Sequence, residues 1–284
     1  MAELNFRKMR VAFQGEPGAF SEAAAIRLLG DGVRTVPRTT FEAAFRAIEE
    51  GAADALLVPV ENTLAGSVVR VYDLLLESNL EMCGEAILPI EHQLIGMPGA
   101  KREELKAVAS HPMALAQCER FFAGNPQVKR VPAEDTAGSV REMMERGEKQ
   151  FGAIAGRRAA AHYGAVVLEE NIQDNAENFT RFVLLLPPDE AKLYRRGADA
   201  TKISLAMRLA HQPGALLASL EPFARHDVNL LKIESRPIHG RPWEYQFYLD
   251  VEAKEPEHLE QALREAREAT SELRVLGKYV AARR

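Results

Sequence analysis

The sequence predicts an α/β fold in two domains, and two observations support this prediction. Between residue 9 and about residue 188, short apolar runs alternate with amphipathic stretches, as in strands and helices of largely parallel sheets. A segment with two prolines and many charges then follows at 187–200, and the remainder has the order β-α-β-β-α-β of a ferredoxin-like unit. The 284 residues are enough for both domains, which we place at 9–188 and 200–282.

The first domain is expected to alternate strands and helices. The segment GEPGAFSEAAAIRLLG (15–30) reads as a turn followed by a helix, and Thr39 to Glu42 has capping-box spacing before the next helix. The run Phe182–Leu186 is expected to be a buried strand. Further strands are predicted at 10–14, 53–61, 81–90, 106–110, 151–156 and 166–170, and helices at 41–51, 68–78, 111–124 and 135–147.

The second domain has its own regular pattern. Its length of about 80 residues suits one small domain. The expected strands are 201–210, 228–237, 245–253 and 273–280, and the expected helices are 214–227 and 257–270. The charged segment that links the two domains lacks periodicity, so we place the domain boundary there.

The composition excludes several classes of function. A net charge of −5 gives no basis for nucleic-acid binding, and no apolar run approaches the ~20 residues that span a membrane. Cys83 and Cys118 have no metal or redox spacing, and the seven histidines form no HxxxH pair. Neither GxGxxG nor GK[ST] is present. We therefore expect a cytoplasmic protein without a metal or a cofactor.

One short stretch, ENFTRFVLLL (177–186), raises a question about charge. Thr180 and Arg181 lie where the chain enters an apolar strand, and a buried arginine needs a partner because an unpaired charge is costly away from water. Two interpretations stay open here. Arg181 forms a salt bridge inside the protein, or it binds an anionic ligand.

Other polar groups follow predicted strands or begin helices. Glu61, Asn62 and Thr63 end a strand, where open α/β sheets bind ligands, although they could equally form a polar turn with Ser67 as the N-cap of the next helix. QGEPGAF (14–20) is either a tight turn or a helix start that offers N–H groups to a carboxylate.

The stretch SHPMALAQC (110–118) places two polar residues on one helix face. Ser110 and Gln117 are seven residues apart, about two helical turns. Gln117 lies among small residues and must find hydrogen-bond partners in the protein or a ligand. His111 is either a general acid or a structural residue at the helix start.

Taken together and in this order, these stretches resemble the prephenate dehydratase family, which includes arogenate dehydratases. The matching segments cover most of residues 10–280; they are GEPGAFSEAAA, PVENTLAGSVVRVYDLLL, SHPMALAQC, NFTRFVLL, GALL and KIESRP. Met113 departs from the SHPQ pattern common in the family. The resemblance implies a first domain like the two-lobed periplasmic binding proteins and a second of the ACT type. The lobes are then about 9–86 with 180–187, and 87–179.

The resemblance also implies an activity without a cofactor. Prephenate would lose carbon dioxide and water to give phenylpyruvate; arogenate is the alternative substrate. It assigns catalytic roles to Thr180, Arg181, Glu61 and Ser110, and substrate binding to Asn62, Thr63, Gln117 and Arg181. Thr180 is expected to donate a hydrogen bond rather than a free proton, because an alcohol is too weak an acid. Glu61 is the other candidate acid.

For the small domain, the resemblance implies regulation by phenylalanine and assembly as a homodimer or homotetramer. The expected effector site comprises Gly214, Ala215, Leu216, Leu217, Glu234, Ser235 and Arg236. Two alternatives to an enzyme stay open. A binding protein could use the two-lobed fold without chemistry, and an amino-acid sensor would need only the small domain.

Overall fold

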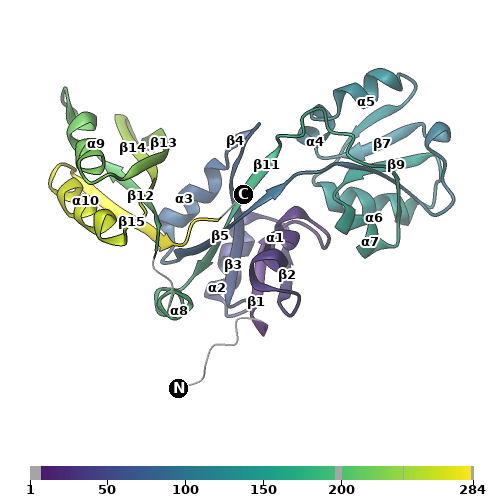
Figure 1. Ribbon diagram of the computed structural model, residues 1–284. Coiled ribbons are helices and arrows are strands. Elements are labelled where there is room, and N and C mark those ends of the chain that lie inside the picture. Colours follow the sequence, from purple (N-terminus) through teal and green to yellow (C-terminus); the bar gives the residue numbers. More distant parts are fainter. Residues whose placement is uncertain (1–7, 196–199, 239, 283–284) are drawn as a thin grey trace. The chain divides into compact units, whose positions relative to one another are not determined.

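The structure is a computed structural model that describes residues 8–195, 200–238 and 240–282. The chain forms two compact units (Figure 1). The first comprises Met1–Leu74 and Ala86–Val183, and the second comprises Leu75–Glu85 and Leu184–Arg284. Residues 196–199 of the charged segment lie outside the described residues. The predicted domain limits, 9–188 and 200–282, stay a prediction. The two compact units follow other limits, because residues 75–85 and 184–188 group with the second unit.

The first lobe of the first unit is built on the strand order β5-β11-β3-β1-β2. β1 pairs in parallel with both β2 and β3, so their carboxyl ends share one edge of the sheet. The elements are β1 (Arg10–Gln14), α1 (Phe20–Leu29), β2 (Arg34–Arg38), α2 (Phe41–Glu49), β3 (Ala55–Asn62), β4 (Gly66–Ser67), α3 (Val69–Glu77), β5 (Glu81–Pro89) and β11 (Phe179–Leu186).

The second lobe is a five-stranded sheet of order β10-β6-β9-β7-β8 between two pairs of helices (Figure 1). Apolar residues of α6 and α7 pack on one face, and those of α4 and α5 pack on the other. The elements are β6 (Gln93–Gly96), the 3₁₀ helix η2 (Arg102–Glu104), β7 (Ala107–Ser110), α4 (Pro112–Ala116), α5 (Glu119–Gly124), β8 (Lys129–Pro132), α6 (Thr136–Arg146), β9 (Phe151–Ala155), α7 (Arg157–Tyr163) and β10 (Val166–Glu169).

The second unit confirms the ferredoxin-like prediction. Its antiparallel strands have the order β13-β14-β12-β15, and α9 and α10 pack their apolar side chains on one face of this sheet (Figure 1). The elements are α8 (Pro188–Tyr194), β12 (Lys202–Arg208), α9 (Ala215–Arg225), β13 (Asn229–Ile238), β14 (Arg241–Glu252), α10 (Pro256–Glu268) and β15 (Glu272–Tyr279). None of the helices in the described ranges is long and apolar enough to span a membrane.

Three local predictions were wrong, and helix α8 begins in the charged segment after Pro187 where the domain boundary is predicted. The helix expected at 111–124 is two helices, α4 and α5, that meet at Gln117 and Cys118. Ser67 lies in β4, paired with β3, and α3 begins at Val69. The N-cap of α2 is Thr40, whose hydroxyl accepts from the Ala43 N–H, so Thr39 does not head a capping box.

Candidate active site

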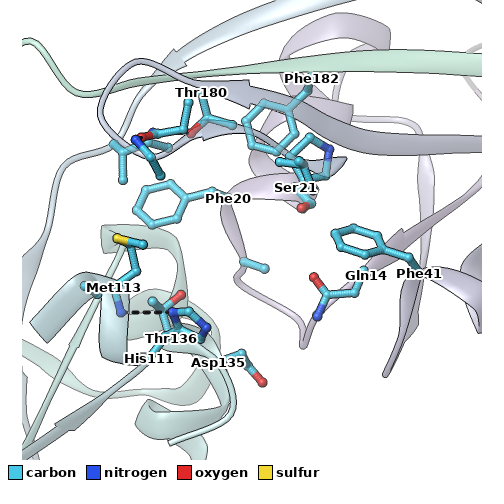
Figure 2. A pocket seen from close by; sticks show the side chains of 18 of the residues that line it. Gln14, Phe20, Ser21, Phe41, His111, Met113, Asp135, Thr136, Thr180 and Phe182 are labelled. Carbon is cyan, nitrogen blue, oxygen red and sulfur yellow. Dashed lines mark hydrogen bonds between the residues drawn. The ribbon is translucent and has the colours of Figure 1, made fainter. Parts of the chain in front are cut away.

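A cavity of about 510 Å³ lies between the two lobes of the first unit (Figure 2). This volume is in the usual range for small-molecule sites. The first lobe and its connections contribute Gln14, Gly15, Ala19, Phe20, Ser21, Thr40, Phe41, Glu42, Pro59, Asn62, Ala65, Val68, Ile90, His92, Thr180 and Phe182. The second lobe contributes His111, Met113, Ala114, Gln117, Glu134, Asp135 and Thr136.

Thr180 is held as a directed hydrogen-bond donor. The Asn62 Oδ1 accepts from the backbone N–H groups of Leu64 and Ala65 at 3.0 and 2.8 Å, which fixes the orientation of this amide. The Asn62 Nδ2 is therefore a donor, and the acceptors around it are the Asn178 Oδ1 at 2.8 Å, the Thr180 Oγ1 at 2.9 Å and the Phe179 carbonyl at 3.1 Å. Because a donor faces the Thr180 Oγ1, the Thr180 hydrogen points away from Asn62 and can be donated to a ligand in the cavity.

Arg181 points away from the cavity and pairs with Glu61. Successive side chains of a strand point to opposite faces, so Arg181, between the lining residues Thr180 and Phe182, lies on the other face of β11. Glu61 is not among the described lining residues either. The Arg181 Nη1 lies 3.5 Å from the Glu61 Oε2, and the Arg181 side chain is only 10% exposed. This geometry favours the internal salt bridge; the substrate-binding role of Arg181 and the catalytic role of Glu61 stay predictions.

Ser110 and Thr63 also make structural hydrogen bonds. Ser110 is fully buried, and its hydroxyl donates to the Ile154 carbonyl at 2.6 Å. The Thr63 hydroxyl donates to the Glu177 carbonyl and accepts from the Phe179 N–H, so it fastens the end of β3 to the start of β11. Neither residue is among the described lining residues, and their assigned roles stay predictions.

Several helices begin at the cavity, and they differ in how their first N–H groups are satisfied. The side chains of Thr40 and Asp135 accept bonds from the first turns of α2 and α6. α1 has Ala19 at its N-cap, which has no side-chain acceptor, and Phe20 and Ser21 of its first turn line the cavity. A helix start of this kind is suited to bind a carboxylate.

Two ion pairs join the lobes behind this helix start. The Arg158 Nε donates to the Glu22 Oε2 at 2.8 Å, and Arg141 pairs with Glu16 at 2.6 Å. Burial raises the pKa of the Glu22 carboxyl, but the hydrogen bonds from Arg158, the Gly18 N–H and the Thr35 hydroxyl outweigh this effect and lower the pKa overall. Glu22 is therefore a carboxylate that holds the start of α1 in place.

Gly18 allows the start of α1 to approach the second lobe closely. A Cβ at this position would lie 2.6 Å from the Ala159 Cα, and its φ of +89° favours glycine. The glycine thus serves a packing purpose that the motif QGEPGAF alone did not reveal.

Two polar residues of the site, Asn178 and His92, were not predicted from the sequence. The Asn178 Oδ1 accepts from the Asn62 Nδ2 at 2.8 Å, and its Nδ2 donates to the Gln117 Oε1 at 3.1 Å. The His92 Nε2 lies 2.8 Å from the same Gln117 oxygen. Their only sequence signal is a polar residue next to an apolar run, which is too common to single them out.

The family model, a curated relative and one solved structure name the same family. A family model described as prephenate dehydratase matches residues 11–190. The arogenate dehydratase/prephenate dehydratase 1 of Arabidopsis thaliana is 40% identical, over 96% of this chain and 72% of its own. The solved prephenate dehydratase of Arthrobacter aurescens, in complex with L-Phe, is 32% identical with a TM-score of 0.83, covering 96% of this chain and 90% of its own. The structure of GqqA, named a quorum quenching acylase, is 33% identical with a TM-score of 0.84, covering 96% and 98%.

Proposed function

Because the chain belongs to the prephenate dehydratase family, we propose that it converts prephenate to phenylpyruvate, carbon dioxide and water. One observation carries the mechanism: the Asn62 Nδ2 faces the Thr180 oxygen as a donor, so the Thr180 hydrogen points elsewhere and can be donated to a ligand in the cavity. In the reaction, the bond from the ring to its carboxylate breaks and its electron pair enters the ring. The ring hydroxyl departs and takes up a proton from solvent to leave as water.

Thr180 stabilises the departing oxygen in this proposal. Its hydrogen bond strengthens as negative charge develops on that oxygen, and a donor fixed in advance needs no reorganisation at that moment. Phe20, Phe41 and Phe182 give the cavity apolar walls (Figure 2). Desolvation of the ring carboxylate against such walls favours loss of carbon dioxide.

The start of α1 supplies the second part of the proposal. Among the described lining residues there is no lysine or arginine, so a substrate carboxylate needs other donors. The first-turn N–H groups of α1, which Ala19 leaves uncapped, provide them together with the positive end of the helix dipole. We assign one carboxylate of the substrate to this position.

The assay that tests the function uses purified full-length protein with prephenate and, in parallel, arogenate. Phenylpyruvate is measured by its absorbance in alkali, and phenylalanine by chromatography. Turnover of prephenate is the expected result, and faster turnover of arogenate would make the chain an arogenate dehydratase. Turnover of neither would favour the binding-protein or sensor alternatives and overturn the proposal.

Regulation by L-Phe is part of the proposed function, supported by the relative solved with that ligand. A cavity of about 430 Å³ in the second unit is lined by Leu209, Ala210, His211, Gln212, Ala215, Leu216, Trp243, Glu244, Tyr245, Phe247 and Ser271. Gly214 is the N-cap of α9 and offers no side-chain cap. The Ala215 N–H donates to the Gln212 carbonyl at 3.3 Å, so the next N–H groups, of Leu216 and Leu217, are the ones that can receive a carboxylate. Aromatic and aliphatic lining suits a phenyl ring.

The structure separates the residues expected for this effector site. Ala215 and Leu216 line the cavity, and Leu217 is exposed next to them. Ser235 lies opposite Phe247 in the sheet and so shares its face. Glu234 and Arg236 alternate with Ser235 and point to the other face, so within one chain their role in binding phenylalanine stays a prediction. Assembly as a dimer or tetramer also stays a prediction.

A further inference from the structure

His92 lies at the end of a chain of hydrogen bonds whose direction can be derived from one fixed point. That point is the Asn62 Oδ1, which accepts from two backbone N–H groups. The Asn62 Nδ2 therefore donates to the Asn178 Oδ1, and the Asn178 Nδ2 in turn donates to the Gln117 Oε1. The Gln117 oxygen is thus an acceptor.

This direction determines which nitrogen of His92 carries the hydrogen. Because an acceptor oxygen lies 2.8 Å from the His92 Nε2, that nitrogen must be the protonated one. The Nδ1 is then a bare acceptor, and it is buried without a hydrogen-bond partner in the described part of the chain. The ring's one protein hydrogen bond is therefore the bond to Gln117.

The surroundings of the ring keep it neutral and in place. His92 is 2% exposed, and burial lowers the pKa of its imidazole more than the hydrogen bond to Gln117 raises it. Phe20 packs edge-on against the ring, with centroids 6.0 Å apart. The backbone of Gln117 is also anchored, since its carbonyl accepts from the Asp174 N–H at 2.8 Å.

We propose that His92 is a positioning residue for the dehydration: its Nε2–H and the Asn178 amide hold the Gln117 oxygen, so that the Gln117 NH₂ group is presented to a substrate oxygen in the cavity. Asn62 and Asn178 thereby align two donors, the Thr180 hydroxyl and the Gln117 amide, through one connected network. The unsatisfied Nδ1 costs free energy whatever the role of the ring, so the proposal rests on the Nε2–H bond to Gln117. The inference rests on the proposed function.

The test replaces the Nε2–H donor and asks whether a donor at the same place restores activity. His92→Leu removes it, His92→Gln places an NH₂ near the Nε2 position, and His92→Asn places one near the Nδ1 position. We expect kcat/KM for prephenate to fall about 10–100-fold in His92→Leu and His92→Asn and to recover largely in His92→Gln. His226→Leu, which removes a histidine bonded to Glu265 in the second unit, is the matched control with unchanged turnover.

A double-mutant cycle shows whether His92 acts through Gln117. If it does, His92→Leu adds little loss to Gln117→Leu, because the amide it orients is already gone. Full additivity would overturn the proposal, as would wild-type kcat/KM in His92→Leu or His92→Asn. Should His92→Leu fail to fold in circular dichroism, the cycle is run with His92→Asn.

A measurement without turnover completes the test. A long-range ¹H–¹⁵N spectrum of histidine-labelled protein should show His92 as the neutral Nε2–H tautomer, and the Nδ1–H tautomer would overturn the proposal. A wild-type protein that converts neither prephenate nor arogenate overturns the proposed function and this inference together. An active wild type with an unaffected His92→Leu overturns the inference alone.

Discussion

The direction of one hydrogen bond supports the role that we propose for the Thr180 hydroxyl. Its oxygen accepts from Asn62, whose amide is fixed by two backbone N–H groups. Replacing Thr180 by alanine should leave the fold intact and lower kcat by about 10²–10³-fold, the usual cost of one preorganised donor. Steady-state kinetics with prephenate and a thermal melt measure the two effects.

Thr180→Ser is the matched control for this prediction. Serine keeps the hydroxyl and loses only a methyl group, so much of the turnover should remain. A Thr180→Ala variant with near-wild-type kcat would remove the hydroxyl from the mechanism.

Arg181 should behave as a structural residue. Removing one partner of a largely buried ion pair leaves the other charge uncompensated. Arg181→Met is therefore expected to lower the free energy of unfolding by about 1–3 kcal/mol, measured by urea denaturation. A variant that is as stable as wild type but has a much higher KM would instead support the substrate-binding interpretation.

The sequence identifies Thr180 and Arg181 as candidate site residues, but it does not show that only one of the two side chains faces the cavity. TRF is one motif, and the resemblance assigned both Thr180 and Arg181 to the substrate. The two side chains nevertheless point to opposite faces of β11, as the alternation of any strand requires. Which face of β11 lines the cavity depends on the strands that pair with it. The sequence alone does not specify this pairing.

At the scale of elements, the break between α4 and α5 has a distant cause. The Asp174 carboxylate accepts from the N–H groups of Glu119 and Arg120, and so caps α5 from 55 residues away. The carbonyl of Gln117 bonds to the Asp174 N–H instead of continuing the helix. Residues 111–124 read locally as one helix because this tertiary cap is invisible in the sequence.

The start of α1 should make the protein sensitive to acid. Glu22 has a lowered pKa in the folded state, so its carboxylate stabilises the fold above its unfolded pKa of about 4.3, and this contribution is lost as the pH falls through the folded value. Glu22→Gln should reduce stability by about 1–3 kcal/mol at pH 7. The difference from wild type should shrink as the pH falls below about 4.

Thermal melts of both proteins between pH 7 and pH 3 measure this difference. Glu119→Gln, which removes an exposed partner of Arg130, is the control and should change stability little at any pH. A gap between wild type and Glu22→Gln that stays constant across this range would contradict the proposed role of the Glu22 charge.

At the scale of the whole molecule, the second unit was the easier one to predict. Its order of elements follows the sequence pattern directly, because each strand and helix has a clear period and β13 pairs with β14, the next strand in the chain. The limits of the two compact units were harder. Residues 75–85 join the second unit through pairings such as Gly277 with Met82, which link segments almost 200 residues apart.

Inhibition by phenylalanine tests how the second unit acts on the reaction. A ligand shifts an equilibrium between two states only if it binds one of them more tightly. We therefore expect L-Phe to lower turnover without competing simply with prephenate. Gly214 has a φ of +81°, which a β-branched residue adopts only with strain. Gly214→Val should displace the first turn of α9 and weaken the binding of L-Phe to the state that it favours. Inhibition should then weaken at least ~10-fold, because a ligand shifts an equilibrium only by the difference between its affinities for the two states.

The control for this last prediction is another glycine in the same backbone conformation. Gly147 ends α6 with a φ of +70° and has open space around its Cβ position, like Gly214. Gly147→Val should carry a similar backbone strain while leaving inhibition by L-Phe unchanged, and both variants should keep the basal rate. Calorimetry on the full chain then relates the loss of inhibition to the loss of binding. Competitive inhibition that survives Gly214→Val would place the phenylalanine site in the cavity of the first unit and refute its assignment to the start of α9.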